Sequence, residues 1–252
     1  MRKKIWKELY GYYMRGCLSG IAKKIRSELI KISDKKTKDS SLRFFKEPVK
    51  CFGVKSPSAL IIAKKYWNEI KDFEKQDIYS VCEKLLSSDY MEEAFVVCIW
   101  GMQFNAFTTL SDLKLFTRWI NKYINNWAKC DAFCSRTIGD FMQKYPHKIP
   151  ELEKWAKSKN RWMRRASAVS LIVPAKKGLY LKESFRICSI LLKDNDDMAQ
   201  KGYGWLLKEE SRKHQKEVFD FVMKNKKEMP RTALRYAIEL MPAGLRAKAM
   251  EK

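Results

Sequence analysis

Three short stretches decide the predicted fold of this chain, and each begins with a basic residue and contains small residues. They are Arg165-Ala166-Ser167-Ala168, Lys201-Gly202-Tyr203-Gly204 and Arg235-Tyr236-Ala237. Their basic residues lie 36 and 34 residues apart, and Asp131 precedes the first of them by 34 residues. A period in the mid-thirties, built from pairs of helices, is typical of α-solenoids. We therefore predict an all-α, right-handed HEAT-like solenoid.

Outward from these stretches, the chain indicates one helix after another from residue 57 onward. No segment shows the sustained period-two alternation that would indicate strands. The expected helices are 57–70, 75–87, 92–104, 110–125, 127–144, 148–157, 161–173, 182–193, 197–209, 213–225 and 230–240. The Trp and Leu-Gly pattern of tetratricopeptide repeats is absent, which favours the HEAT-like type. In the first of these helices, the side chains expected to face the core are Leu60, Ile61, Tyr66 and Trp67.

The first part of the chain has a less regular pattern. Residues 5–32 fit two short amphipathic helices, residues 33–41 predict a polar loop or link, and residues 42–52 predict a helix interrupted by Pro48. We expect one HEAT-like repeat domain over 1–252, with N-terminal helices and a linker in 1–41 and the solenoid in 42–252. Core packing is the favoured role of the N-terminal helices, and a membrane-surface role is the alternative.

Charge is the strongest global signal. The chain has 52 Lys and Arg against 29 Asp and Glu, which gives a formal net charge of +23. So large an excess favours a polyanionic partner, nucleic acid first and an acidic membrane second, although it can also serve solubility alone. In a solenoid the inner helices line a concave face, where Arg165, Lys201 and Arg235 would form a basic groove for a phosphate backbone.

Composition also argues against several classes of protein. The seven Cys have irregular spacing without a Cys-x2-Cys pair, and only His147 and His214 could join them as ligands. We therefore expect no disulfide framework, no metal site and no cofactor. The longest apolar run, from Ala94 to Met102, is too short to span a bilayer. No signal peptide is indicated, so a cytoplasmic protein without membrane attachment is expected, associated with the nucleoid when it is bound to DNA.

The candidate chemistry centres on Asn126-Trp127-Ala128-Lys129-Cys130-Asp131. Trp127 and Asp131 are one helical turn apart, so an indole and a carboxylate share one helix face. Such a pair suits a site that stabilises positive charge. Ordinary structural roles are the alternatives: Trp127 could be a core aromatic, and Asp131 an N-cap or a surface ion-pair partner.

Two further positions join this pair if the inner helices share a face. Arg165 could position Asp131 or hold a phosphate, and it could also bridge to an acidic residue on a neighbouring helix. Trp205 follows Gly202 and Gly204, which are costly inside a helix and so indicate either a closely approaching ligand or tight helix packing. Trp205 could again be a core aromatic. The Trp residues assigned to packing are Trp6, Trp67, Trp100, Trp119, Trp155 and Trp162.

From about residue 42 to its end, the chain resembles the AlkD-type DNA alkylation-repair glycosylases, all-helical proteins of HEAT-like repeats. The matching segments are Gly53-Val54 with Pro57, Asn126-Trp127 with Asp131, Trp162 with Arg164-Arg165, the run from Lys201 to Glu209, and Arg231-Thr232-Ala233-Leu234-Arg235-Tyr236-Ala237-Ile238-Glu239. Each segment is a weak signal, but five in order at repeat spacing are specific.

The resemblance implies that the catalytic residues are Trp127, Asp131, Arg165 and Trp205. The basic residues expected to contact DNA are Arg164, Lys201, Arg235 and Lys129. One departure is Ala128, because family members often carry an acidic residue there. Lys129 and Cys130 also replace residues that are more usually apolar, so the preference among substrates is left open.

The activity implied by the resemblance is hydrolysis of the N-glycosidic bond of cationic N3- or N7-alkylated purines in duplex DNA. A monomer is the simplest expectation, because one solenoid would bind one duplex. Asp131 would stabilise the oxocarbenium-like transition state and assist water. The resemblance argues against a Lys nucleophile for lyase chemistry. The alternative function is a non-catalytic HEAT-like scaffold that binds nucleic acid or protein.

Overall fold

The computed structural model describes residues 20–251, and the regular elements of this part of the chain are all helices, with no strand. An isolated bridge between Lys50 and Tyr90 is the β-type pairing found there. The all-α prediction is therefore confirmed. The chain divides into two compact units, of which the first ends at Phe107 and the second begins at Thr108. The prediction of a single domain over 1–252 stays a prediction, and so do the right-handed twist and the concave groove.

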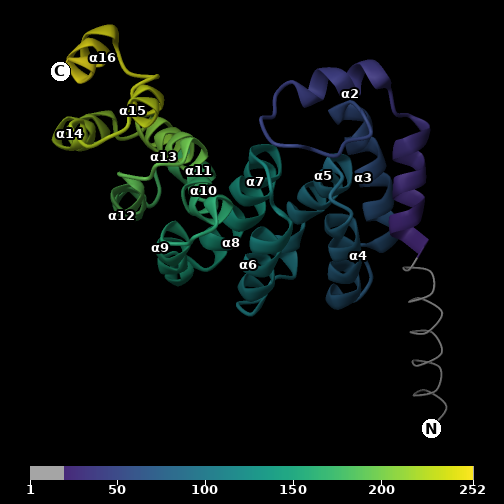
Figure 1. Ribbon diagram of the computed structural model, residues 1–252. Helices are drawn as coiled ribbons and strands as arrows, with labels where there is room; N and C mark the ends of the chain where they lie inside the picture. Colours follow the sequence, from purple (N-terminus) through teal and green to yellow (C-terminus); the bar gives the residue numbers. More distant parts are fainter. Residues whose placement is uncertain (1–19, 252) are drawn as a thin grey trace. The chain divides into compact units, whose positions relative to one another are not determined.

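The first unit is built on a helix over 20–31, in which Ile21, Ile25 and Leu29 are buried as the predicted amphipathic pattern requires, whereas Ile32, the last residue of that pattern, follows the helix and is exposed. The predicted helix around Trp6 lies outside the described residues. The elements that follow are α2 (Lys35–Leu42), α3 (Ser56–Ile70), α4 (Lys75–Ser87), α5 (Met91–Gly101) and the 3-10 turn η1 (Phe104–Ala106). Helix α5 packs against both α3 and α4, as Figure 1 shows in blue.

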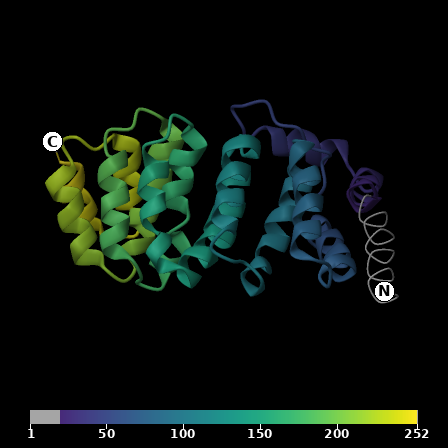
Figure 2. The ribbon, with the colours of Figure 1, turned by 90° about the horizontal axis from the view of Figure 1, so that it is seen from below.

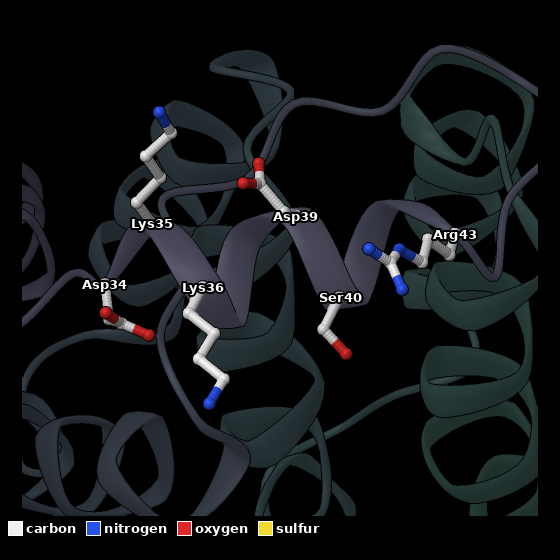
Figure 3. A pocket seen from close by; sticks show the side chains of 6 residues that line it. All are labelled: Asp34, Lys35, Lys36, Asp39, Ser40 and Arg43. Carbon is white, nitrogen blue, oxygen red and sulfur yellow. The ribbon is translucent and has the colours of Figure 1, made fainter.

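The segment before α3 differs from the prediction. Residues 33–41 are not a link, because they contain α2, whose first turn is capped by the Asp34 carboxylate accepting from Thr37 N at 2.7 Å. This helix buries none of its side chains, so the sequence has no apolar periodicity from which the helix could be predicted. Figure 3 shows charged side chains projecting from α2 and its ends.

Residues 44–55, by contrast, form an irregular loop in place of the helix predicted over 42–52. Pro48 cannot donate a helical hydrogen bond, and the buried Glu92 carboxylate binds the loop from α5. It accepts the backbone N–H groups of Phe52, Gly53 and Val54 at 2.8–3.1 Å. Gly53 has φ +93°, and a Cβ there would lie 2.3 Å from the carbonyl oxygen of Asp34. The Gly53-Val54 motif therefore serves a tight backbone contact between this loop and α2.

Two of the four residues expected to face the core in α3 do not. The buried face of α3 consists of Ala59, Ile62, Ala63, Tyr66 and Ile70, which follow helical spacing. Leu60 and Ile61 lie off this stripe and are exposed, whereas Trp67 is half-buried. The packing role predicted for Trp100, Trp119, Trp155 and Trp162 is confirmed, since all four are buried.

The second unit contains the helices that carry the predicted site. They are α6 (Asp112–Tyr123), α7 (Trp127–Phe133), the π-helical η2 (Cys134–Ile138), α8 (Gly139–Lys144), the 3-10 turn η3 (Pro146–Lys148), α9 (Pro150–Ala156), α10 (Arg161–Val169), α11 (Ile172–Lys176), α12 (Leu181–Leu191), α13 (Asp197–Glu210), α14 (Gln215–Asn225), α15 (Arg231–Ala237) and α16 (Ala243–Met250). The expected helix 127–144 corresponds to α7, η2 and α8 in succession. No predicted segment corresponds to α16.

These helices form two rows. Helices α7, α10, α13 and α15 contact one another in that order, while α9 and α12 pack beside them and α14 contacts α13 and α15. Figure 1 shows α10, α13 and α15 as a diagonal series from green to yellow, with α7 in teal, and Figure 2 shows the same helices from below. The first row carries Asp131, Arg165, Lys201 and Arg235, so the repeat column predicted from the spacing runs along consecutive stacked helices.

The two glycines of α13 serve helix packing. A Cβ on Gly202 would lie 3.2 Å from Cγ of Arg165, on α10. A Cβ on Gly204 would lie 2.7 Å from Cβ of Tyr236 and 2.8 Å from the carbonyl oxygen of Ala233, both on α15. The glycines therefore let α13 approach both neighbours in the row, which resolves the two sequence alternatives in favour of packing.

We expect Gly204→Ala to destabilise the protein by about 2 kcal/mol, because the new methyl group would overlap the α15 backbone, which cannot move aside cheaply. Gly244→Ala on α16 is the matched control, since its Cβ would meet nothing within 4 Å. That change should be neutral or stabilising by up to about 1 kcal/mol. Urea denaturation followed by circular dichroism measures both. Equal effects of the two substitutions would contradict the packing role of Gly204.

Candidate functional site

The site begins at the N-terminus of α7. Asn126 lies in an extended conformation before the helix, and its side-chain oxygen accepts from Lys129 N at 3.0 Å. This N-cap fixes the start of the helix at Trp127 and so places Asp131 one turn later on the same face. Asp131 is thus an interior helical residue, and the N-cap role belongs to Asn126. The Cys130 thiol is within 3.7 Å of the Trp162 carbonyl oxygen, which ties α7 to α10.

The central interaction is a bidentate ion pair between Arg165 and Asp131. Nε of Arg165 donates to Oδ1 of Asp131 and Nη2 donates to Oδ2, both at 2.8 Å. Nη1 of the same guanidinium donates to the Met198 carbonyl oxygen at 2.6 Å. One arginine on α10 therefore links α7 and α13, and its planar fork sets the orientation of the carboxylate.

This ion pair is largely buried but remains partly accessible to solvent. The side chain of Arg165 is 7% exposed and that of Asp131 is 19% exposed, so solvent reaches the carboxylate but hardly the guanidinium. Burial raises the pKa of Asp131 above that of an ordinary aspartate, against the hydrogen bonds and positive charge of Arg165, which lower it. Arg165 is bonded to Asp131, which agrees both with a role in positioning Asp131 and with an ordinary ion pair between helices. Because its guanidinium is fully engaged in these contacts, Arg165 is not free to bind a phosphate.

Two indoles lie on α7 and α13, the helices that Arg165 links. Trp127 is half-buried, one turn before Asp131 on α7. Trp205 is half-buried on α13, one turn after Gly202, the residue that packs on Arg165. Neither is a fully buried core aromatic. Nε1 of Trp205 donates to Oε1 of Glu209 at 3.0 Å, so the orientation of this ring is set by a carboxylate.

The four residues expected to contact DNA differ in how available they are. Arg164 forms its own bidentate pair with Asp194 and also donates to the carbonyl oxygen of Ser158. Lys201 pairs with Asp197 at 3.3 Å, and the buried Lys129 donates to the side chain of Asn125.

Arg235, by contrast, is exposed on α15. The row of stacked helices thus carries all four, but Arg164, Lys129 and Lys201 are engaged in contacts within the protein.

Three features of the site are absent from the sequence prediction. One is Glu209, whose i,i+4 spacing from Trp205 is the signal that could have revealed the contact. A second is the Met198 carbonyl, a backbone group that residue types do not reveal. The third is the π-helical η2 directly after α7, where Ser135 Oγ donates to the Asp131 carbonyl oxygen at 2.7 Å. Such π segments are frequent at functional sites.

A hollow in the surface of the first unit lies apart from the predicted site residues. The hollow drawn in Figure 3, with a volume of about 610 Å³, is lined by α2 and its ends and contains none of the predicted site residues. No group of three or more His, Cys, Asp or Glu within residues 20–251 is arranged to hold a metal ion. No helix in that range is long and apolar enough to span a bilayer.

Comparison with known proteins identifies the family. The family model described as "DNA alkylation repair enzyme" matches residues 25–241, which is most of the chain. The chain belongs to this family. Its role is therefore in the repair of alkylated DNA, and DNA is its partner. The AlkD-type resemblance seen in the motifs is confirmed.

Solved structures of similar fold have low sequence identity to this family member. One, described as a predicted DNA alkylation repair enzyme from Enterococcus faecalis, has a TM-score of 0.76 at 15% identity and covers 84% of this chain and 97% of its own. AlkD2 from Streptococcus mutans has a TM-score of 0.56 at 19% identity, with coverage of 83% and 100%. These similarities show a solenoid-like AlkD-type fold. No curated protein matches the chain.

We expect Arg165→Ala to destabilise the protein by about 3 kcal/mol, because it leaves a largely buried carboxylate without its partner. The pKa of Asp131 should rise further, since burial then acts unopposed by Arg165. A carboxyl with a raised pKa in the folded state favours folding at low pH, so the loss should shrink as the pH falls. Urea denaturation across a pH series measures this.

The control is Arg235→Ala, which removes an exposed arginine from the same row and should change stability by less than about 0.5 kcal/mol. A pH-independent loss for Arg165→Ala would show that the arginine stabilises the fold through packing and not through the Asp131 charge.

Proposed function

We propose that this family member is a monofunctional DNA glycosylase that hydrolyses the N-glycosidic bond of cationic N3- or N7-alkylated purines in duplex DNA. The observation that carries the proposal is the partly exposed Asp131 carboxylate, held in one orientation by Arg165 on the face that also bears Trp127. A fixed anion beside an aromatic ring fits a reaction in which positive charge builds up.

The proposed reaction requires few groups besides a fixed carboxylate and an aromatic ring. An alkylated purine is already a cation, so the C1′–N bond breaks with its electron pair going to the base, which leaves neutral without protonation. The deoxyribose becomes oxocarbenium-like, and water adds to C1′ and releases a proton. The Asp131 carboxylate would stabilise the sugar cation and orient the water, as carboxylates do in glycoside hydrolysis.

Arg165 shapes what Asp131 can do. It engages each carboxylate oxygen once, and each oxygen keeps a further lone pair for water or sugar. Its positive charge makes the carboxylate a weaker base but keeps it ionised. Asp131 therefore acts mainly through its charge and position, with proton acceptance as a lesser contribution.

The indoles and basic residues complete the proposed complex. Trp127 and Trp205 would place their faces against the cationic lesion and sugar. Arg235, which is exposed, is best placed to meet a phosphate, and Lys201 could exchange Asp197 for one. Arg164 and Lys129 would act less directly because their contacts lie within the protein. The protein would act as a cytoplasmic monomer on one duplex, without cofactors.

A second candidate function is a DNA-binding scaffold without turnover. Arg165 occupies both oxygens of Asp131 and joins three helices, which is sufficient to explain the pair structurally. Ala128 also leaves the site without the acidic neighbour that many family members carry. The two functions differ in whether the native protein releases any base.

We expect Asp131→Asn to reduce release of N7-methylguanine and N3-methyladenine from duplex DNA by about 100-fold or more, because the amide carries no charge. DNA affinity should change little, since most of it comes from phosphate contacts. The measurement is free base released in single-turnover reactions, with affinity measured in parallel by fluorescence anisotropy.

Asp194→Asn is the matched control, since Asp194 pairs with the adjacent Arg164 in the same bidentate way. It should keep base release within a few-fold of the native rate. Undiminished release by Asp131→Asn would exclude Asp131 from catalysis. Salt-dependent DNA binding without release by the native protein would establish the scaffold.

The pH dependence of base release should have an acidic limb. Asp131 acts as an anion, so activity falls as the pH drops through its pKa, which burial raises above the range of an ordinary aspartate. Rates corrected for spontaneous base loss, measured from pH 4 to pH 8, locate the midpoint. The residual rate of Asp131→Asn should lack this limb. A limb of the same midpoint in that variant would assign it to another group.

A further inference from the structure

Glu209 accepts a hydrogen bond from the Trp205 indole, and the reaction proposed above assigns no role to this contact. It lies one turn after Trp205 on α13, and its Oε1 accepts the indole Nε1–H at 3.0 Å. Its side chain is only 4% exposed. Rotation of the indole about its Cβ–Cγ bond would break this hydrogen bond and leave a buried carboxylate oxygen unsatisfied, so the ring is held in one orientation.

The charge of Glu209 is secured by its other partners. Arg212 donates from Nε to Oε2 at 2.5 Å, and Lys176 lies 4.0 Å from the same oxygen. Burial raises the pKa of Glu209, but the hydrogen bonds from Arg212 and Trp205 and the nearby positive charges outweigh it and leave the pKa below the ordinary range. Glu209 is therefore an anion at neutral pH, with one oxygen committed to the indole.

An anionic acceptor changes what the indole can bind. A charge-assisted hydrogen bond to Nε1–H is stronger than a neutral one and draws the proton toward the carboxylate. Electron density on the ring rises with it, and the ring faces become more attractive to a cation. Trp205 is half-buried one turn after Gly202, which packs on Arg165, and the proposed function places this enhanced face at the Asp131 site.

We propose that Glu209 is a positioning residue that fixes the Trp205 ring and, through its negative charge, strengthens the preference of the site for a cationic base over a neutral base of the same shape. The proposal rests on the proposed function in that it assigns Trp205 to lesion contact. It adds a carboxylate that selects for charge without touching the substrate.

The test compares two full-length variants with the native protein. Glu209→Gln keeps an amide oxygen that can accept from Nε1 but removes the charge, whereas Glu209→Ala removes both. The matched control is Glu239→Gln, because Glu239 pairs with Lys208, the neighbour of Glu209, and its loss changes the net charge equally. Thermal unfolding establishes that each variant is folded.

The readout is a ratio of affinities. One duplex carries N7-methylguanine on a 2′-fluoroarabinose sugar, which resists cleavage, and the other carries the neutral isostere 7-methyl-7-deazaguanine on the same sugar. Native protein should prefer the cationic duplex. Glu209→Gln should lower that preference by about three- to ten-fold, and Glu239→Gln should leave it unchanged. An unchanged preference in Glu209→Gln would overturn the proposal, as would a native protein that does not distinguish the two duplexes.

A double-mutant cycle guards against a purely structural effect. In a Trp205→Phe background the indole N–H is gone, so Glu209→Gln should cause no further loss of preference. If Glu209→Gln lowered the preference for the cationic duplex as much in the Trp205→Phe background as in the native protein, the role of the Trp205 contact would be overturned. Because these affinities require no base release, absence of release from a cleavable duplex would refute the glycosylase alone, whereas the affinity ratio decides the role of Glu209.

Discussion

The structure of the second unit depends on one buried arginine. Arg165 spans from α10 to the Asp131 carboxylate on α7 and to the Met198 carbonyl on α13, so three consecutive helices of the row meet at one guanidinium. A buried arginine of this kind is stable only with all its close partners in place, because each unpaired charge or polar group would carry a large desolvation cost. That requirement fixes the spacing of the helices, and the same contacts fix the orientation of the carboxylate.

Close approach of the helices is the second requirement, and glycine meets it. Gly202 allows α13 to lie against the side chain of Arg165, and Gly204 allows it to lie against the backbone of α15. A larger residue at either position would separate the helices and lengthen the hydrogen bonds that Arg165 makes. The geometry of the site in this unit therefore depends on the packing of its helices. The Lys201-Gly202-Tyr203-Gly204 stretch allows that packing, because its glycines permit the close approach of α13 to α10 and α15.

Helix positions in the second unit were predictable because apolar periodicity and caps are local properties. The prediction failed where the cause is not local. Helix α2 has no apolar face, and the loop before α3 takes its conformation from Glu92, which lies some 40 residues further along the chain. Exposure of Leu60 and Ile61 follows from which stripe of α3 meets α5, and that depends on the partner helix.

For the candidate site, spacing alone placed Trp127 and Asp131 on one helix face and aligned Arg165 with Asp131 through the repeat period. The choice of Trp127, Asp131, Arg165 and Trp205 as one set came from the resemblance to the family. Which of their contacts form was decided by tertiary structure alone. The pair between Asp131 and Arg165 joins residues 34 positions apart. Arg164 is adjacent to Arg165 in sequence, yet it pairs with Asp194 instead. Glu209 accepts a hydrogen bond from the Trp205 indole. Periodicity determines the face of a helix, but the partner of each charge depends on distances between helices, which only the packed chain sets.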